Sequence, residues 1–128
     1  MRVLLDTHVF LWWNEDSPRL SKKARRILSD PGNTPVLSVA SAWEIVIKAQ
    51  AGKLRLPEEA AAYVPTRAAH YGMEILPIYL AHALALQMLP LLHRDPFDRI
   101  LIVQSQVEKL SLLSADPAIS GYAVDSIW

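Results

Sequence analysis

The sequence of 128 residues contains no cysteine, which excludes disulfide bonds, thiolate metal sites and cysteine nucleophiles. It also lacks any uninterrupted apolar run of about 18 residues, the length that a transmembrane helix requires. The apolar run before Asp6, Val3-Leu4-Leu5, is too short for the hydrophobic region of a signal peptide. From these absences we expect a protein of the reducing cytoplasm that has no membrane partner.

The sequence also has no excess of charge of either sign, because 13 Lys and Arg balance 13 Asp and Glu. A neutral chain argues against a nucleic-acid-binding protein of the strongly basic kind. That argument weakens if several acids are occupied by metal ions, since the basic side chains then outnumber the free acids. Composition alone therefore leaves nucleic acid binding open.

Apolar residues make up 52% of the sequence, enough for the core of one domain spanning residues 1–128. Short apolar runs predict strands, which in chain order are 3–5, 35–39, 74–78, 111–114 and, at the edge, 124–128. Helical spacing and capping residues predict helices between them, over 7–14, 22–28, 41–52, from 57, over 80–88 and over 96–110. This alternation predicts an α/β fold with a central parallel sheet that helices cover on both faces.

Three details of these helices are specific enough to be checked. Ser41 is the expected N-cap of the helix after the second strand, with Trp43, Val46 and Ile47 on its buried face and Gly52 at its end. Pro57-Glu58-Glu59 is expected to begin the next helix. The helix that Asp95-Pro96 opens is expected to bury four apolar residues, Ile100, Val103, Val107 and Leu110.

Four acids lie where a predicted strand ends or a predicted helix begins. Asp6 and Asp116 follow the first and the fourth apolar runs, whereas Glu44 and Asp98 lie in the first turns of two helices. In parallel sheets, ligands bind beyond the carboxyl ends of the strands. If the strands are neighbours, the four carboxylates converge at one edge of the sheet.

Each acid also has an ordinary structural explanation. A helix N-cap often precedes Thr or Pro, as Asp6, Asp95 and Asp116 do here. Glu44 can instead form an ion pair with Lys48 one turn later in the same helix. Four carboxylates on one edge, however, repel one another unless a cation lies between them. Oxygen ligands favour Mg²⁺ or Mn²⁺, whereas four scattered histidines and no cysteine give little support for zinc. One or two ions fit such a cluster.

Four stretches resemble the PIN-domain ribonucleases of the VapC toxin type along nearly the whole chain. They are Leu4-Leu5-Asp6-Thr7-His8, Ser38–Ile45 with its Trp43-Glu44 pair, His93-Arg94-Asp95-Pro96-Phe97-Asp98-Arg99-Ile100-Leu101-Ile102, and Leu113-Ser114-Ala115-Asp116-Pro117. The third is the most specific. The late motif departs mildly from the family, because Ser114 stands where threonine is common.

The resemblance implies a three-layer α/β/α fold, dependence on Mg²⁺ or Mn²⁺, and endonucleolytic cleavage of RNA by a water that the metal activates. It also implies a homodimer and a cognate antitoxin. By position, the metal-binding catalytic quartet is Asp6, Glu44, Asp98 and Asp116. Asp95 competes with Asp98 for the third position, and we favour Asp98 because Asp95 is well placed to cap the helix.

Other residues near the quartet are expected to play supporting roles. We expect Thr7 and Ser114 to orient the ligands by hydrogen bonds. His93, Arg94 and Arg99 flank the site and are candidates for contacts with RNA phosphates, although Arg99 can equally pair with an acid on its own helix. His8 is interpreted as a local hydrogen-bonding residue. For the tryptophans Trp12, Trp13 and Trp43, we expect core packing rather than base stacking, with at least one of the adjacent pair facing outward.

Two other functions remain to be weighed. A two-component receiver domain also has an acidic Mg²⁺ pocket, but it needs an acidic pair near the first strand and a lysine after the last. Here Asp6 stands alone and no lysine follows Lys109. A non-catalytic interaction module on the PIN fold is the stronger alternative, against which the complete quartet argues.

Overall fold

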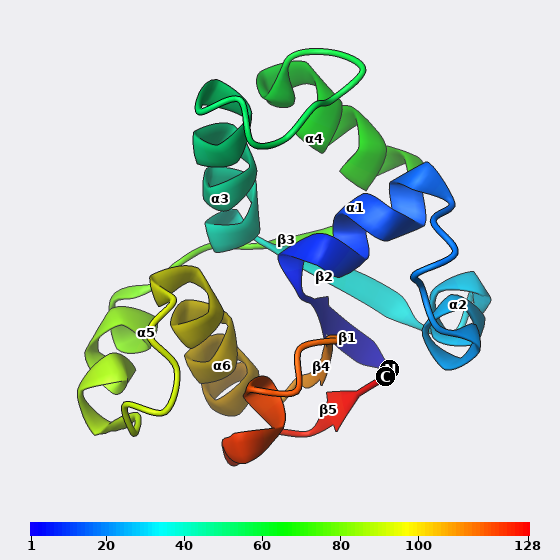
Figure 1. Ribbon diagram of the computed structural model, residues 1–128. Coiled ribbons are helices and arrows are strands. Elements are labelled where there is room, and N and C mark those ends of the chain that lie inside the picture. The colour runs from blue at the N-terminus through cyan, green and yellow to red at the C-terminus, as the bar shows by residue number, and fades with distance from the viewer.

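A parallel sheet of five strands forms the centre of the computed structural model, which describes residues 1–128 (Figure 1). The strands are β1 (Arg2–Leu5), β2 (Thr34–Ser38), β3 (Glu74–Leu76), β4 (Ser111–Leu113) and β5 (Ser126–Ile127). Their order across the sheet is β3-β2-β1-β4-β5. The α/β fold predicted from the sequence is therefore confirmed, including the strand at the edge formed by the last residues.

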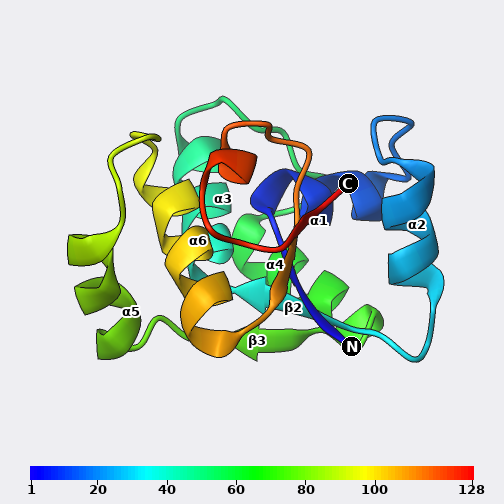
Figure 2. The same ribbon diagram turned by 90° about the horizontal axis from the view of Figure 1, so that it is seen from below.

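Helices cover both faces of this sheet, as the alternation of strands and helices predicted. The helices are α1 (Thr7–Glu15), α2 (Lys22–Ser29), α3 (Val39–Gln50), α4 (Ala60–His70), α5 (Leu80–Ala85) and α6 (Pro96–Glu108), with short 3₁₀ turns η1 (Leu86–Met88) and η2 (Ile119–Gly121). None of them combines the length and the apolar character needed to cross a bilayer. Figure 2 shows α5 at one end of the molecule and α2 at the other.

Two apolar cores lie on the two faces of the sheet. Successive side chains of a strand point to opposite faces, so Val3 and Leu5 join one core while Leu4 joins the other. The first core is completed by residues of α1 to α4, and the second by residues of α6 and its neighbours (Figure 1). The result is the three-layer α/β/α arrangement.

The prediction for α3 was wrong in its start and in its buried face. Ser38, not Ser41, is the N-cap, since its Oγ accepts a hydrogen bond from the Ala40 N–H at 3.0 Å. The helix buries Ala40, Ser41, Glu44 and Ile45, whereas Trp43 is 57% exposed and Val46 and Ile47 lie with it at the surface. Apolar residues occur on both sides of this helix, so their spacing did not identify the buried side.

Smaller differences concern three other segments. Helix α4 begins at Ala60 rather than at Pro57, which stays in the preceding loop. In α6, Val103 is buried as expected, and so is Leu110 just after the helix, but Ile100 is only half-buried and Val107 is 41% exposed. Trp12 and Trp13 are both half-buried, so the expectation that one of them faces outward was wrong. The Trp12 ring packs against Trp128, and the Trp13 ring packs against Tyr71.

Candidate active site

The carboxyl ends of β1, β2 and β4 meet at one edge of the sheet, where a cleft of about 310 Å³ opens. Because β1 pairs with both β2 and β4, the segments that follow these strands lie side by side. All four acids of the predicted quartet, Asp6, Glu44, Asp98 and Asp116, line this cleft together with Asp95. The convergence inferred from strand order is therefore present, although Glu44 lies in the second turn of α3 rather than the first.

Asp6 is the most firmly held carboxylate of the cleft. It is 2% exposed, and its Oδ1 accepts the Thr7 N–H at 2.7 Å while its Oδ2 accepts the Ser114 hydroxyl at 2.6 Å. Burial raises the pKa of Asp6, an effect that the nearby His8 and the Ser114 hydrogen bond oppose. The Ser114 Oγ also accepts the Asp116 N–H at 3.0 Å, so one hydroxyl connects two of the acids.

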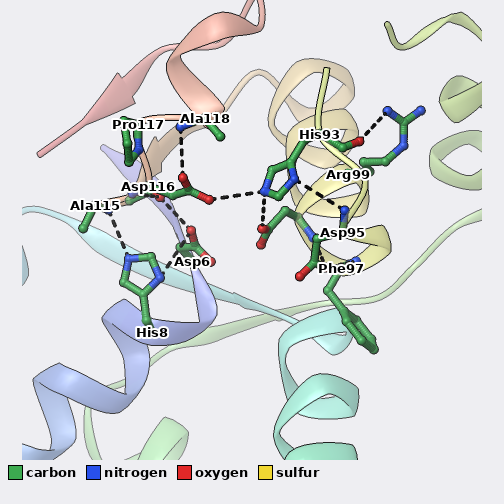
Figure 3. Close-up of polar contacts among 12 residues, drawn as sticks. Asp6, His8, His93, Asp95, Phe97, Arg99, Ala115, Asp116, Pro117 and Ala118 are labelled. Carbon is green, nitrogen blue, oxygen red and sulfur yellow. Dashed lines mark hydrogen bonds and ion pairs between the residues drawn. The ribbon is translucent and has the colours of Figure 1, made fainter. Parts of the chain in front are cut away.

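His8 is a hydrogen-bonding residue beside Asp6, as predicted, but its hydrogen-bond partner is distant in the sequence rather than local. Its Nε2 accepts the Ala115 N–H at 3.1 Å, which places the ring proton of a neutral imidazole on Nδ1 (Figure 3). That nitrogen lies 3.6 Å from the Asp6 Oδ2. The imidazole therefore orients toward the carboxylate and joins α1 to the loop after β4.

His93 contacts the carboxylates of both Asp98 and Asp116, and Figure 3 shows its ring directed toward Asp116. Its Nε2 is 2.8 Å from the Asp98 Oδ2 and 3.3 Å from the Asp116 Oδ2, so the three residues form a compact group with the composition of a metal site. Burial, followed by the charges of Asp6 and Asp95, raises the pKa of Asp98 to about 7. The cleft thus carries more negative charge than its own residues neutralise.

Glu44 provides a second sign of missing positive charge. Its side chain is buried, and its Oε2 pairs with Lys48 Nζ at 2.6 Å, the contact that the sequence offered as an ordinary explanation. Its Oε1 is buried as well but has no hydrogen-bond partner. A buried carboxylate oxygen without a donor is unfavourable, and a cation in the cleft would satisfy it.

The remaining predicted residues divide into supports and surface groups. The Asp95 Oδ1 accepts the N–H groups of Phe97 and Asp98 at 2.9 and 3.3 Å, which confirms it as the N-cap of α6. Arg99 pairs with no acid of its own helix; it donates to the carbonyls of Pro90, Leu89 and His93. Arg94 is exposed and does not line the cleft.

Helices α1 and α3 are joined beneath the cleft by a contact that the sequence did not reveal. The Thr7 hydroxyl donates to the Ser41 Oγ at 2.9 Å rather than to a carboxylate. Thr7 therefore supports Asp6 through its backbone, while its side chain fixes α3 and hence Glu44. Another residue that the sequence reading missed is Lys53, which lines the cleft. The only feature of the sequence that pointed to Lys53 as a cleft residue is its position directly after Gly52, where the helix was predicted to end.

The PIN domain family profile matches residues 3–124, nearly the whole chain. The chain belongs to the PIN-domain family. A curated relative, Ribonuclease VapC16 of Mycobacterium tuberculosis, is 45% identical over 69 residues. That match covers 51% of this chain and 49% of the relative, so this chain spans about half the length of the curated relative it matches.

Solved structures confirm the PIN fold over the full length. VapBC2 from Rickettsia felis, bound to a promoter DNA fragment, superposes with a TM-score of 0.73 at 12% identity, covering 100% of this chain and 99% of that one. A toxin–antitoxin complex from Klebsiella pneumoniae gives a TM-score of 0.63 at 17% identity, covering 98% and 96%. At these identities the likeness establishes the fold. The family resemblance inferred from the motifs is confirmed.

Proposed function

We propose that this PIN-domain protein is a metal-dependent endoribonuclease and the toxin of a toxin–antitoxin pair. The observation that carries the proposal is the convergence of four carboxylates, from four separate segments, on one cleft in which a buried Glu44 oxygen lacks a donor. Membership in the family and the similarity to a protein described as a ribonuclease support the same activity.

The residues of the cleft fit Mg²⁺ or Mn²⁺. Hard carboxylate oxygens are the ligands that these ions prefer, and Asp6, Glu44, Asp98 and Asp116 would hold the metal. Bound there, the ion would supply Lewis-acid activation of water and neutralise charge on the scissile phosphate. Asp95 stays with the N-terminus of α6, because its Oδ1 already accepts two backbone N–H groups.

The protein's own residues would prepare this chemistry by fixing the carboxylates. The Ser114 hydroxyl donates to Asp6 and accepts the Asp116 N–H, so it fixes these two acids relative to each other. The Thr7 hydroxyl fixes α3 through its hydrogen bond to Ser41. We place RNA phosphate contacts at His93, which contacts Asp98 and Asp116 of the cleft, and at the exposed Arg94 that follows it in the chain. Arg99 would act indirectly, by fixing the backbone of residues 89–93 through its three hydrogen bonds.

The proposal includes a homodimer and a cognate antitoxin, acting in the cytoplasm, where RNA and a newly made antitoxin are found. Support for a homodimer comes from four apolar side chains of α5 and the loop after it: Leu80, Leu84, Met88 and Leu91 are 74%, 62%, 85% and 86% exposed. No Asp, Glu, Lys or Arg occurs between residues 75 and 93, so two copies can pair there without charge repulsion. Leu84→Glu should therefore be a monomer by light scattering. A variant with the same dimeric mass as the wild type would show that the dimer interface lies on another surface.

Cleavage of a mixed RNA pool, with Mg²⁺ and with EDTA, tests the activity directly. We expect Asp6→Asn, Asp98→Asn and Glu44→Gln to remain folded by circular dichroism and to lose cleavage. Glu58→Gln is the matched control, because Glu58 is exposed and lies outside the cleft. Folded variants that cut at the wild-type rate would favour the alternative, a non-catalytic interaction module on the same fold.

A further inference from the structure

The C-terminus of α3 turns back on itself beside the cleft. Gly52 adopts a left-handed backbone with φ of 73°, and its N–H donates to the Ala49 carbonyl at 3.2 Å. The N–H of Lys53 donates to the Lys48 carbonyl at 2.9 Å. Together these two bonds define a Schellman motif, in which the residue after the glycine lies beside the residue five positions earlier.

The two side chains that this motif brings together are both lysines. Such a pair is usually apolar, because the motif packs the two side chains against each other. Here Lys48 and Lys53 carry like charges, which repel unless an anion lies near both. Both line the same cleft as the carboxylates, and the Lys48 side chain is 49% exposed.

An RNA strand that enters this cleft meets five carboxylates, which repel its phosphates. Lys48 and Lys53 are the only Lys or Arg residues among those that line the cleft. Lys48 already neutralises one oxygen of Glu44, from which its Nζ lies 2.6 Å away. A cation held by Glu44 would take over that neutralisation and leave the lysine available to another anion.

We propose that Lys48 and Lys53 form a phosphate-binding subsite for the RNA backbone at the α3 end of the cleft. The proposal rests on the proposed nuclease function and deepens it, because it places a phosphate next to the one that is cut. The geometry assigns no base-specific contact to the pair, so the subsite contributes affinity and position rather than sequence preference.

Binding of a fluorescein-labelled oligouridylate, followed by fluorescence anisotropy, tests the subsite without cleavage. All proteins carry Asp98→Asn and are measured with Mg²⁺ over a range of KCl concentrations. We expect Lys48→Gln and Lys53→Gln each to weaken binding about fivefold at about 0.1 M salt, and to flatten the slope of log K against log[salt] by about 0.7. Lys23→Gln is the matched control, since Lys23 is exposed on α2 and absent from the cleft.

A further variant separates geometry from charge. Gly52→Ala keeps both lysines but disfavours the left-handed turn that brings them together, so it should weaken binding without a change in net charge. Equal affinity and salt slope for the two lysine variants and Lys23→Gln would overturn the subsite, as would weaker binding with an unchanged slope. Neither result bears on the proposed nuclease activity. That proposal would be refuted separately, if the wild type did not cleave RNA in the RNA-pool assay.

Discussion

Replacing Asp98 by asparagine should stabilise the metal-free protein at neutral and higher pH. Burial and the charges of Asp6 and Asp95 raise the pKa of Asp98 from 3.8 to about 7, and the opposing effect of His93 is smaller. The folded state therefore disfavours the ionised carboxylate relative to the unfolded chain. Asparagine keeps the shape of the side chain and removes the charge.

The pH dependence of this effect follows from which state ionises first. Below about pH 4 Asp98 is protonated in both states and no penalty exists; as pH rises from about 4 to 7 only the unfolded state ionises, and the folded protein loses relative stability. The difference between a pKa of 3.8 and one of about 7 corresponds to about 4 kcal/mol. Asp98 is 15% exposed and therefore partly screened by solvent. We expect about 2 kcal/mol above about pH 7.

Urea unfolding followed by circular dichroism, in EDTA, measures this difference. The gain of Asp98→Asn over the wild type should be near zero at about pH 4 and about 2 kcal/mol at about pH 8. Saturating Mg²⁺ should reduce the advantage of the variant, because a ligand at about 100 times its Kd adds about 2.7 kcal/mol to the wild type and less to the variant. A variant that is no more stable than the wild type at about pH 8 in EDTA would refute this reasoning.

Four further substitutions test other parts of the cleft. Ser114→Ala removes the hydroxyl that donates to Asp6 and should lower the free energy of unfolding by about 1–3 kcal/mol in urea titrations; no loss would show that this bond contributes little. Asp95→Ser retains an N-cap oxygen and should keep RNA cleavage, whereas Asp98→Ser should abolish it; the opposite pattern would exchange the two assignments. Gly52→Ala should lower the melting temperature by an amount equivalent to about 1 kcal/mol, and an unchanged value would show that the left-handed turn is unstrained.

The sequence predicted best those parts of the site that depend on local rules. Asp6 follows a three-residue apolar run, and its place at the sheet edge follows from the parallel arrangement that alternating strands and helices require. Asp95 before Pro96 predicted the start of α6 correctly, because an aspartate cap and a proline in the first turn are both strong local preferences.

The parts that the sequence did not predict depend on tertiary contacts. Ser38 and Ser41 are both competent N-caps, and only the end of β2 decides between them. The position of His93 depends on a long-range bond, in which its N–H donates to the Tyr122 hydroxyl, and on a nearer one, in which its carbonyl accepts from Arg99. Loop residues without periodicity carry no signal for such contacts. Lys53 was missed because its direction depends on a helix end, which sequence patterns place only within a few residues.

The way in which each carboxylate is compensated explains how an acidic cleft can exist before the proposed metal binds. Asp6 is held by fixed neutral donors, the Ser114 hydroxyl and a backbone N–H, which hold the carboxylate in place. Glu44 is held instead by Lys48, and the other two acids by His93, side chains on the rim that reach solvent. An ion can replace those contacts at little cost, because the displaced groups remain hydrated. We therefore expect an ion bound in the cleft to disturb the contacts of Asp6 least among these four acids.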